Sequence, residues 1–204
     1  MFHQKSLFLF AEEAISSASK ISGLTYISDY ITAEQEAELI AIIDQQPWLN
    51  DLKRRVQHYG YKYDYTARRV TSDLKLGDLP DWVMGYCNEL HQKQLYPQVP
   101  DQVIVNEYQP GQGIASHIDC VPCFREAIAS ISLGSPCIMD FVHSKTNEKL
   151  PVLLEPRSLF VLNGDARYVW KHGIASRKTD KITGNKISRG RGISITFRKV
   201  ILED

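Results

Sequence analysis

Three residues in the second half of the chain have the types and spacing of metal ligands. His117 and Asp119 stand two positions apart in the segment His117-Ile-Asp119, and His172 follows much later. Because side chains alternate across an extended strand, His117 and Asp119 would share one face. Two imidazoles and one carboxylate leave metal positions open, which suits non-haem iron(II) with a co-substrate and dioxygen. Zinc tolerates the same ligands, so the residue types alone leave both metals possible.

Other polar residues have the chemistry to bind an anionic co-substrate beside such a metal. Arg198 lies in the expected last strand, Ser-Ile-Thr-Phe-Arg-Lys-Val, and a guanidinium forms two-pronged ion pairs with carboxylates. Asn106 and Tyr108 share a face of the segment that leads toward His117, and both offer neutral hydrogen bonds. A structural role stays open for each: Tyr108 in the core, Asn106 in a turn and Arg198 on an edge strand.

The elements expected to position these residues begin with helices. Thr32-Ala-Glu-Gln35 has the form of a capping box, and apolar residues at helical spacing follow it, which predicts a helix over 33–46. A second helix is expected over 81–95, and a short strand over 24–27. Residues 55–65 alternate aromatic and polar side chains, which is typical of a strand or hairpin.

After Pro100, short β-branched and aromatic runs alternate with Gly and Pro turns. This pattern predicts an all-β sandwich or barrel of about seven or eight strands. The expected strands are 103–108, 128–133, 137–143, 152–154, 158–162, 167–170 and 193–200. We therefore expect a single domain over 24–204, with a lid over about 50–75 and a loosely attached arm over 1–23.

The composition is that of a globular protein. Its 204 residues are 43% hydrophobic and 24% charged, which suits one folded domain. Lys+Arg and Asp+Glu number 24 each, so net charge gives no argument for a polyanionic partner. The basic residues nevertheless gather in two stretches, one over 171–199 and one that contains Lys53, Arg54, Arg55, Arg68 and Arg69. Such stretches suit phosphate groups, and solvated loops beside a sheet are the alternative interpretation.

Cys120 and Cys123 form a Cys-x-x-Cys pair. Such pairs occur in redox and zinc sites, but zinc needs a second ligand pair, and Cys87 and Cys137 do not form one. We therefore expect structural or incidental roles for them. The sequence shows neither a signal peptide nor an apolar run long enough to span a membrane, so we expect a cytoplasmic monomer without a membrane partner.

Five ordered stretches of the chain resemble the AlkB family of iron(II)- and 2-oxoglutarate-dependent dioxygenases. These stretches are 106–119, 130–135, 139–141, 164–174 and 193–200. The resemblance covers about residues 54–200. It implies a mostly β fold with flanking helices, in which a double-stranded β-helix, or jelly roll, follows an N-terminal helix and a hairpin lid.

The resemblance also implies roles for individual residues. It makes His117, Asp119 and His172 the iron ligands. It assigns contacts with 2-oxoglutarate to Asn106, Tyr108, Arg198 and, in a supporting position, Ser194. The expected cofactors are therefore Fe(II), 2-oxoglutarate and dioxygen. Family members flip a base into the site and oxidise an alkyl group on it, so nucleic acid is the expected partner.

The lid is where the resemblance places substrate contacts. Tyr61, in Tyr59-Gly-Tyr-Lys-Tyr63, matches a lid tyrosine of the family. With Tyr59, Arg54 and Arg55 it is expected to hold a base and its phosphates by stacking and charge. The alternative is a hairpin that packs its tyrosines on the core.

The substrate itself stays open between DNA, RNA and protein. DNA-repair members carry an acid two residues after the metal aspartate, where this chain has Val121. The stretch 164–172 is closer to the homologue that hydroxylates a modified wobble uridine in transfer RNA. Both features weaken a simple prediction of methyl-adenine or methyl-cytosine repair.

One position near the last strand departs from the family pattern. Gly192 stands six residues before Arg198, where an arginine is usual, and Arg191 is one place early. On a regular strand a shift of one residue turns a side chain to the opposite face. Arg191 would therefore need a β-bulge at Gly190 or Gly192 to reach the co-substrate, and Arg189 is the other candidate.

Three functions follow from these observations. The leading one is a dioxygenase that hydroxylates or demethylates alkyl groups on bases of DNA or RNA. The second is a 2-oxoglutarate oxygenase that acts on a protein or a small molecule. The third is a non-catalytic binding module that keeps the fold, which Gly192 suggests and the intact residues His117, Asp119, His172 and Arg198 oppose.

Overall fold

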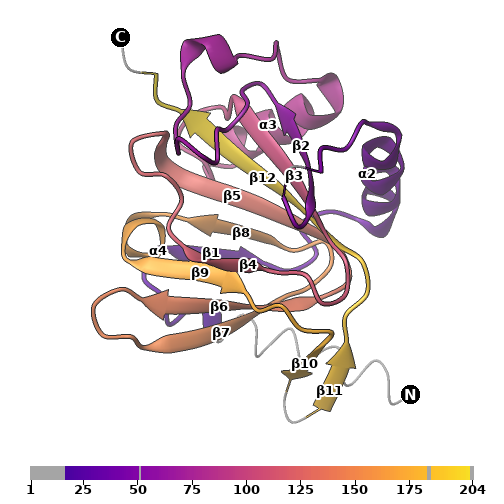
Figure 1. Ribbon diagram of the computed structural model, residues 1–204, viewed down its shortest axis with the longest axis vertical. Helices are drawn as coiled ribbons and strands as arrows, with labels where there is room; N and C mark the ends of the chain where they lie inside the picture. Colours follow the sequence, from indigo (N-terminus) through magenta and orange to yellow (C-terminus); the bar gives the residue numbers. More distant parts are fainter. Residues whose placement is uncertain (1–16, 51, 183–184, 203–204) are drawn as a thin grey trace.

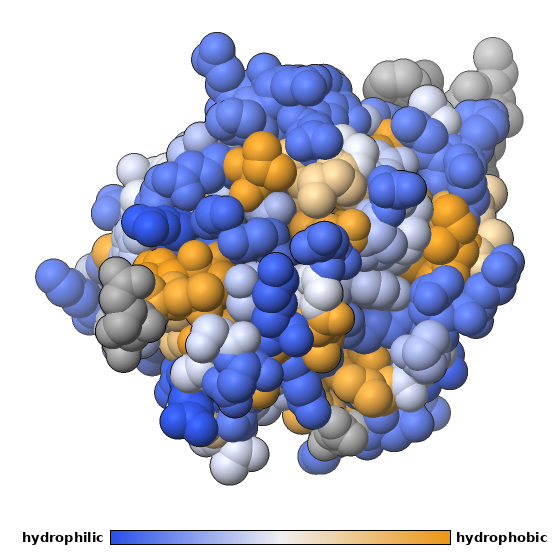
Figure 2. Space-filling model, turned by 90° about the horizontal axis from the view of Figure 1, so that it is seen from above, coloured by the Kyte–Doolittle hydropathy of each residue, from blue (hydrophilic) through white to orange (hydrophobic). Residues whose placement is uncertain are grey.

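A computed structural model describes residues 17–50, 52–182 and 185–202. Two antiparallel sheets face each other, and the longer helices lie on the outer side of the larger sheet (Figure 1). The predicted mostly β fold with flanking helices is therefore confirmed. Seen from above, the surface is mostly hydrophilic with several separate hydrophobic patches (Figure 2), which is ordinary for a folded protein.

The larger sheet has six strands in the order β1-β8-β5-β12-β3-β2. They are β1 (Leu24–Ile27), β8 (Leu159–Leu162), β5 (Phe124–Gly134), β12 (Gly192–Val200), β3 (Gln102–Tyr108) and β2 (Arg55–Tyr59). Strand β12 lies between β5 and β3, and its apolar side chains Ile193, Ile195 and Phe197 pack toward the helices. Because side chains alternate along a strand, the polar side chains of β12 face the smaller sheet.

The smaller sheet has four strands in the order β4-β9-β6-β7. They are β4 (Ile114–His117), β9 (Trp170–Ile174), β6 (Cys137–His143) and β7 (Lys149–Leu154). A separate two-stranded hairpin is formed by β10 (Thr179–Ile182) and β11 (Asn185–Ser188). Figure 1 shows this hairpin beyond the end of the smaller sheet, just before the chain enters β12.

The helices are α2 (Ala33–Gln45), α3 (Asp81–Gln92), the short α4 (Gly164–Tyr168) and a single 3-10 turn, η1 (Ser72–Leu74). The predicted capping box of α2 is present, since Gln35 N donates to Thr32 Oγ1 at 3.2 Å and Thr32 N donates to Gln35 Oε1 at 2.8 Å. Within the described part of the chain, no helix is both long enough and apolar enough to cross a membrane.

Two apolar clusters hold these layers together. The first lies between α2, α3 and the larger sheet and contains Leu39, Ile43, Val83 and Phe197. The second lies between the two sheets and contains large side chains such as Phe141 of β6. Packed side chains therefore set the distance between the two sheets. Polar side chains that lie in this interior are buried and need hydrogen-bond partners.

The strand predicted over 167–170 is wrong. The chain forms α4 there, and β9 begins only at Trp170. The reason is the side chain of Arg167, which is 1% exposed and donates hydrogen bonds to four backbone carbonyls of the segment 119–125. A helical turn places this guanidinium inward, whereas the local sequence pattern carries no sign of the distant partner.

Several other expectations differ from the structure in detail. Residues 55–65 do not pair with each other as a hairpin, because β2 pairs with β3 and the chain then turns away at Gly60. Strands β10 and β11 were not expected, and their sequences are short and largely polar. Strand β4 ends at His117, so Asp119 lies just outside the extended segment that was expected to hold both side chains. Of the expected N-terminal arm, residues 1–16 lie outside the described residues, while Ala18 and Ile21 are buried in the core between the sheets.

Charged residues on the outer side of the larger sheet attach α2 to it. Glu107 of β3 is 1% exposed, and Arg55 donates to both of its carboxylate oxygens at 2.6 Å each. Arg191 donates to the same carboxylate at 2.6 Å and to Asp44 of α2 at 2.9 Å. Burial alone would raise the pKa of Glu107, but the two guanidinium groups outweigh it and hold that pKa below its ordinary value.

Replacement of Glu107 should therefore weaken the fold, most clearly near neutral pH. We expect Glu107→Gln to lower the free energy of unfolding by about 2 kcal/mol, because two arginines lose their anionic partner. The folded pKa is below the unfolded value of about 4.3, so this contribution is complete above that pH and is lost as pH falls toward the folded pKa. Urea unfolding at neutral and acidic pH measures the difference, which should shrink on acidification.

The exposed residue Glu126 of β5 offers a matched control. Glu126→Gln should leave the unfolding curve unchanged at both pH values, since surface substitutions have small effects. A Glu107→Gln variant as stable as the wild type at neutral pH would contradict the role assigned to this ion cluster.

Candidate active site

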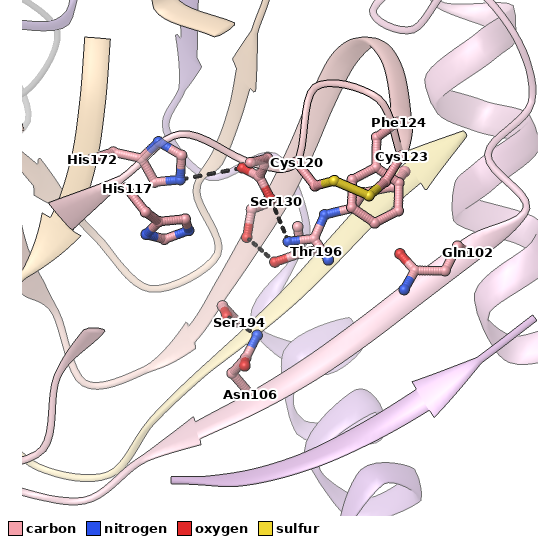
Figure 3. Close-up of polar contacts among 12 residues, drawn as sticks. Gln102, Asn106, His117, Cys120, Cys123, Phe124, Ser130, His172, Ser194 and Thr196 are labelled. Carbon is pink, nitrogen blue, oxygen red and sulfur yellow. Dashed lines mark hydrogen bonds and ion pairs between the residues drawn. A yellow bond between two sulfur atoms is a disulfide. The ribbon is translucent and has the colours of Figure 1, made fainter. Parts of the chain in front are cut away.

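His117, Asp119 and His172 form a compact cluster on the smaller sheet. His117 ends β4 and pairs with His172 of β9, so the two rings lie side by side with centroids 4.6 Å apart. Asp119 follows on the loop after β4, and its Oδ2 lies 3.4 Å from Nε2 of His172. One possible ligand atom from each residue lies within 4.8 Å of the others. Figure 3 shows the imidazoles of His117 and His172 next to each other.

The protonation of His117 suits a metal ligand. Its Nδ1 lies 2.8 Å from the backbone oxygen of Ala115, which can only accept, so Nδ1 carries the proton and Nε2 is left with its lone pair. Burial, and then the neighbouring His172, lowers the pKa of His117 to about 4. At neutral pH the ring is therefore uncharged and able to bind a cation.

Asp119 is held from the opposite sheet. Arg198 of β12 donates from Nη2 to Asp119 Oδ1 at 2.6 Å, and the guanidinium lies 4.8 Å from the centroid of the Phe124 ring. Burial alone would raise the pKa of Asp119, but Arg198 and the two histidines outweigh it and hold that pKa well below its usual range. The carboxylate is therefore ionised and fixed, with its second oxygen turned toward His172.

A cavity of about 450 Å³ lies between the sheets and reaches the three candidate ligands. Asn106, Tyr108 and Ser194, three residues expected to contact the co-substrate, line it. Asn106 Nδ2 donates to Ser194 Oγ at 3.4 Å, and Figure 3 shows these two side chains meeting between neighbouring strands. Burial raises the pKa of Tyr108 to about 12, so its hydroxyl remains a hydrogen-bond donor at neutral pH.

The lid contributes Arg54, Tyr63 and Tyr65 to the cavity wall. Arg54 donates from Nε to Asn106 Oδ1 at 2.8 Å, and its guanidinium lies 6.0 Å and 5.9 Å from the ring centroids of Tyr65 and Tyr108. Tyr63 and Tyr65 meet edge to face at 4.9 Å. Arg54 was predicted as a substrate contact, whereas Tyr63 and Tyr65 were not, although both tyrosines continue the alternation that begins at Tyr59.

Three other predicted substrate contacts lie elsewhere in the structure. Arg55 pairs with Glu107 on the outer side of the larger sheet and stacks on Trp48. Tyr59 packs edge to face on Trp82 of α3, with ring centroids 5.3 Å apart. Tyr61 packs against the core between the sheets but is not among the described residues that line the cavity. The alternation of the segment is interrupted at Gly60, whose φ is 75°, so the tyrosines before and after it point to different surroundings.

Arg191 also lies away from the cavity. Strand β12 pairs without interruption from Gly192, opposite Gly134 and Tyr108, to Arg198, and therefore has no bulge that would turn Arg191 inward. The side chain instead joins the ion cluster with Glu107 and Asp44 on the outer side. By contrast Arg189, just before β12, lines the cavity.

The loop that carries Asp119 is fixed by two further contacts. Arg167 donates to the backbone oxygens of Asp119, Cys120 and Phe124 at 2.9, 3.2 and 3.2 Å. A disulfide joins Cys120 to Cys123, and the backbone oxygen of Arg68 lies 3.3 Å from each sulfur. The disulfide thus closes the loop that carries Asp119 onto itself, and its sulfur atoms pack against the backbone of Arg68 in the lid, which is a structural role.

Residues 43–198 match a family model described as the 2OG-Fe(II) oxygenase superfamily. The match covers more than half of the chain and includes all three candidate ligands. The chain belongs to this superfamily. It is therefore a 2-oxoglutarate-dependent dioxygenase.

This oxygenase is AlkB-like. It is 40% identical to the uncharacterized protein L905 of Acanthamoeba polyphaga mimivirus, over 91% of this chain and 89% of that protein. It is 36% identical to the "Alkylated DNA repair protein ALKBH8 homolog" of Arabidopsis thaliana, over 91% of this chain and 60% of that protein. It is also 36% identical to the "tRNA (carboxymethyluridine(34)-5-O)-methyltransferase alkbh8" of Xenopus tropicalis, over 91% of this chain and 33% of that protein. The chain thus spans only part of the length of the plant and frog proteins.

Solved structures support the same fold. The structure of OsALKBH1 superposes with a TM-score of 0.61 at 17% identity, over 87% of this oxygenase and 96% of that chain. A Pseudomonas putida prolyl-4-hydroxylase superposes with a TM-score of 0.56 at 14% identity, over 94% of this oxygenase and 98% of that chain. These likenesses concern the fold alone, and they confirm the predicted jelly-roll core.

The cofactors of the superfamily are Fe(II), 2-oxoglutarate and dioxygen, and the residues present fit them. Two imidazoles, of which that of His117 is uncharged at neutral pH, and an ionised carboxylate form the donor set that non-haem iron(II) prefers. The Nε of Arg198 is buried and has no hydrogen-bond partner among the described residues. An unpartnered cationic donor beside the ligands is suited to a carboxylate of the co-substrate, because a buried donor is costly unless it is paired.

The close approach of β4 and β9 yields a test of this metal centre. A β-carbon on Gly173 would lie 2.8 Å from both the Cα and the N of Ser116, so Gly173→Ala must push the two strands apart. Because His117 and His172 stand on these strands, we expect the affinity for Mn(II) or Zn(II) to fall by about tenfold or more. Isothermal titration calorimetry with the metal measures this loss.

A matched substitution is available in α3. A β-carbon on Gly85 would meet no atom of the described residues within 4 Å, so Gly85→Ala should leave the metal affinity unchanged. If Gly173→Ala bound metal as tightly as Gly85→Ala, the spacing of β4 and β9 would not control the site.

Proposed function

We propose that this dioxygenase hydroxylates or demethylates alkyl groups on bases of nucleic acid, and that it does so as a monomer. The observation that carries this proposal is the composition of the cavity wall. Two tyrosines and an arginine of the lid, Tyr63, Tyr65 and Arg54, line the same cavity as the three metal ligands. Aromatic faces stack on bases of any sequence, and a guanidinium pairs with phosphate or stacks on a base.

In this proposal His117, Asp119 and His172 hold the iron, and Asn106, Tyr108, Ser194 and Arg198 hold 2-oxoglutarate. Iron and co-substrate together supply the oxidising power when they are bound. The chain's own residues supply position. Tyr108 offers a protonated hydroxyl and Arg198 a guanidinium donor, and both side chains line the cavity between the two sheets.

The cavity is large enough for a base. Its volume of about 450 Å³ lies within the range of small-molecule sites, which is roughly 300 to 1,000 Å³.

Val121 stands two residues after the metal ligand Asp119, and its apolar side chain is 48% exposed. Base recognition here would therefore depend on stacking and charge from the lid, and not on a carboxylate at this position.

Among nucleic acids, RNA is the first substrate class to test. The frog relative is named for an activity on carboxymethyluridine 34 of transfer RNA, although this chain spans 33% of that protein. A modified uridine carries an alkyl carbon outside the ring, which is the kind of group that this chemistry oxidises. DNA is the second class, since the plant relative is named for repair of alkylated DNA.

The direct test is succinate formation by iron-loaded protein given 2-oxoglutarate and oxygen. We expect turnover to rise when transfer RNA with carboxymethyluridine, or a methylated oligonucleotide, is added, and to require His117. The variant His117→Ala should show no metal-dependent turnover, because one of three ligands is lost. Turnover that no nucleic acid stimulates would reject nucleic acid as substrate, and no succinate at all would reject catalysis.

The role of the lid has its own prediction. Tyr65→Ala should raise the KM for the nucleic acid about tenfold, the order expected for the loss of one base-stacking partner, with little change in the KM for 2-oxoglutarate. Initial rates over a range of both substrates measure the two constants. Tyr168→Ala is the matched control, because Tyr168 is 41% exposed on α4 and does not line the cavity. Equal effects of the two substitutions would argue against stacking on Tyr65.

A further inference from the structure

We infer that Arg189 binds the distal carboxylate of 2-oxoglutarate in this oxygenase. The inference extends the proposed function, and it rests on that function only in taking 2-oxoglutarate as the co-substrate. Arg189 precedes β12, whose first residue, Gly192, has no side chain to offer a cation there. Arg189 lines the cavity, and its side chain is 5% exposed.

The need for a second cation follows from the chemistry of the co-substrate. 2-Oxoglutarate has a carboxylate at each end, and a carboxylate buried without a cationic or hydrogen-bonding partner is costly. Arg198 lies at the metal, where it contacts Asp119. At the other end of β12, Gly192 has no side chain, and Arg191 points to the outer side of the sheet. The distal carboxylate therefore needs a cation that does not come from β12.

Arg189 is held in a fixed position with donors to spare. It donates from Nε and Nη2 to the two oxygens of Asp180, at 2.5 and 2.9 Å, and from Nη1 to the backbone oxygen of Ala175 at 2.7 Å. An arginine side chain has five N–H donors, so two remain for a ligand. A guanidinium that is already ordered loses little entropy when it binds a carboxylate.

The position of Arg189 fits a ligand that also reaches the metal. Ala175, which accepts from Arg189, follows β9 only three residues after His172. A strand rises about 3.3 Å per residue, so the backbone group to which Arg189 is bound lies roughly 10 Å along the chain from that of His172. Tyr108 pairs across the sheet with Gly192, so its side chain lies next to the place that Gly192 leaves free. A hydroxyl and a guanidinium thus converge near one end of the cavity.

The charge balance around Arg189 remains positive. Asp180 is 2% exposed and also accepts from Arg177 at 2.6 Å, so two guanidinium groups share one carboxylate. Burial would raise the pKa of Asp180, but Arg189 and Arg177 outweigh it and keep this carboxyl ionised. Burial also raises the pKa of the nearby Cys137 thiol to about 11, so this cavity residue is uncharged at neutral pH. One positive charge is therefore left for the distal carboxylate.

The experiment compares two 2-oxo acids of equal chain length. Isothermal titration calorimetry measures the Kd of 2-oxoglutarate and of 2-oxopentanoate, which lacks the distal carboxylate. Mn(II) replaces iron so that no turnover occurs. We expect Arg189→Met to raise the Kd of 2-oxoglutarate roughly 30-fold, the order expected for a charge-assisted hydrogen bond. The Kd of 2-oxopentanoate should change by less than about threefold, since it offers nothing for the guanidinium to bind.

The two ligands separate a binding role from a structural one. Asp180 keeps Arg177 and the backbone N–H of Ile138 as partners in the variant, so it is not left as an unpaired buried charge. Arg191→Met is the matched control, because it removes an ion-paired arginine from the outer side, and it should change neither Kd. Parallel weakening of both acids by Arg189→Met, or no change in either, would overturn the inference.

The wild-type titration distinguishes this inference from the proposed function. Wild-type protein that binds neither acid would overturn both together. Wild-type protein that prefers 2-oxoglutarate, and keeps that preference in Arg189→Met, would overturn the inference alone. Gly192→Arg added to Arg189→Met should restore the preference. Among the described residues, a β-carbon at Gly192 would meet Ser135 O alone, at 3.4 Å, and it would stand opposite Tyr108.

Discussion

The ion pair between Arg198 and Asp119 joins the two sheets at the metal centre. Arg198 belongs to the larger sheet and Asp119 to a loop of the smaller one, and their side chains are 12% and 4% exposed. Charges that are buried to this degree require partners with good geometry. The spacing of the sheets, set by the apolar side chains between them, is what brings these two groups to 2.6 Å. The orientation of the carboxylate toward His172 follows from this contact.

Strand β12 contributes one face to the hydrophobic core and the other face to the cavity. Its side chains Ile193, Ile195 and Phe197 pack beneath the helices, whereas Ser194 and Arg198 face the cavity. The strand period of two separates these roles, so each face meets one requirement. The regular register of β12 also explains Arg191, which falls on the outer face and strengthens the attachment of α2.

Much of this arrangement could be predicted from the sequence because it depends on local periodicity. The helix expected over 33–46 is α2, and the strand expected over 137–143 has the bounds of β6. The structure also gathers His117, Asp119 and His172, which were singled out by type and spacing. Each of these features is expressed by residues close in sequence or by an ordered set of motifs.

The errors arise where a distant contact decides the local structure. Arg167 bends its segment into α4 because its partners are carbonyls of another loop, and no periodic pattern records such a contact. The tyrosine segment could be recognised as alternating, but the turn at Gly60 decides that Tyr63 and Tyr65, and not Tyr61, line the cavity. Strands β10 and β11 pair with each other, and each contains only one apolar residue, so no alternation of apolar and polar residues marks them in the sequence.

The contacts of Arg167 also set an order of events during folding. This residue stands 48 positions after Asp119, yet it supplies the hydrogen bonds that hold the backbone of the metal-ligand loop. During synthesis the chain emerges from its N-terminal end, so His117 and Asp119 leave the ribosome well before Arg167 and His172. Contacts of such long range form late, because the chain between them must first be ordered. The full set of candidate metal ligands therefore exists only after His172 has been synthesised, when the chain from β1 to β8 has already been made.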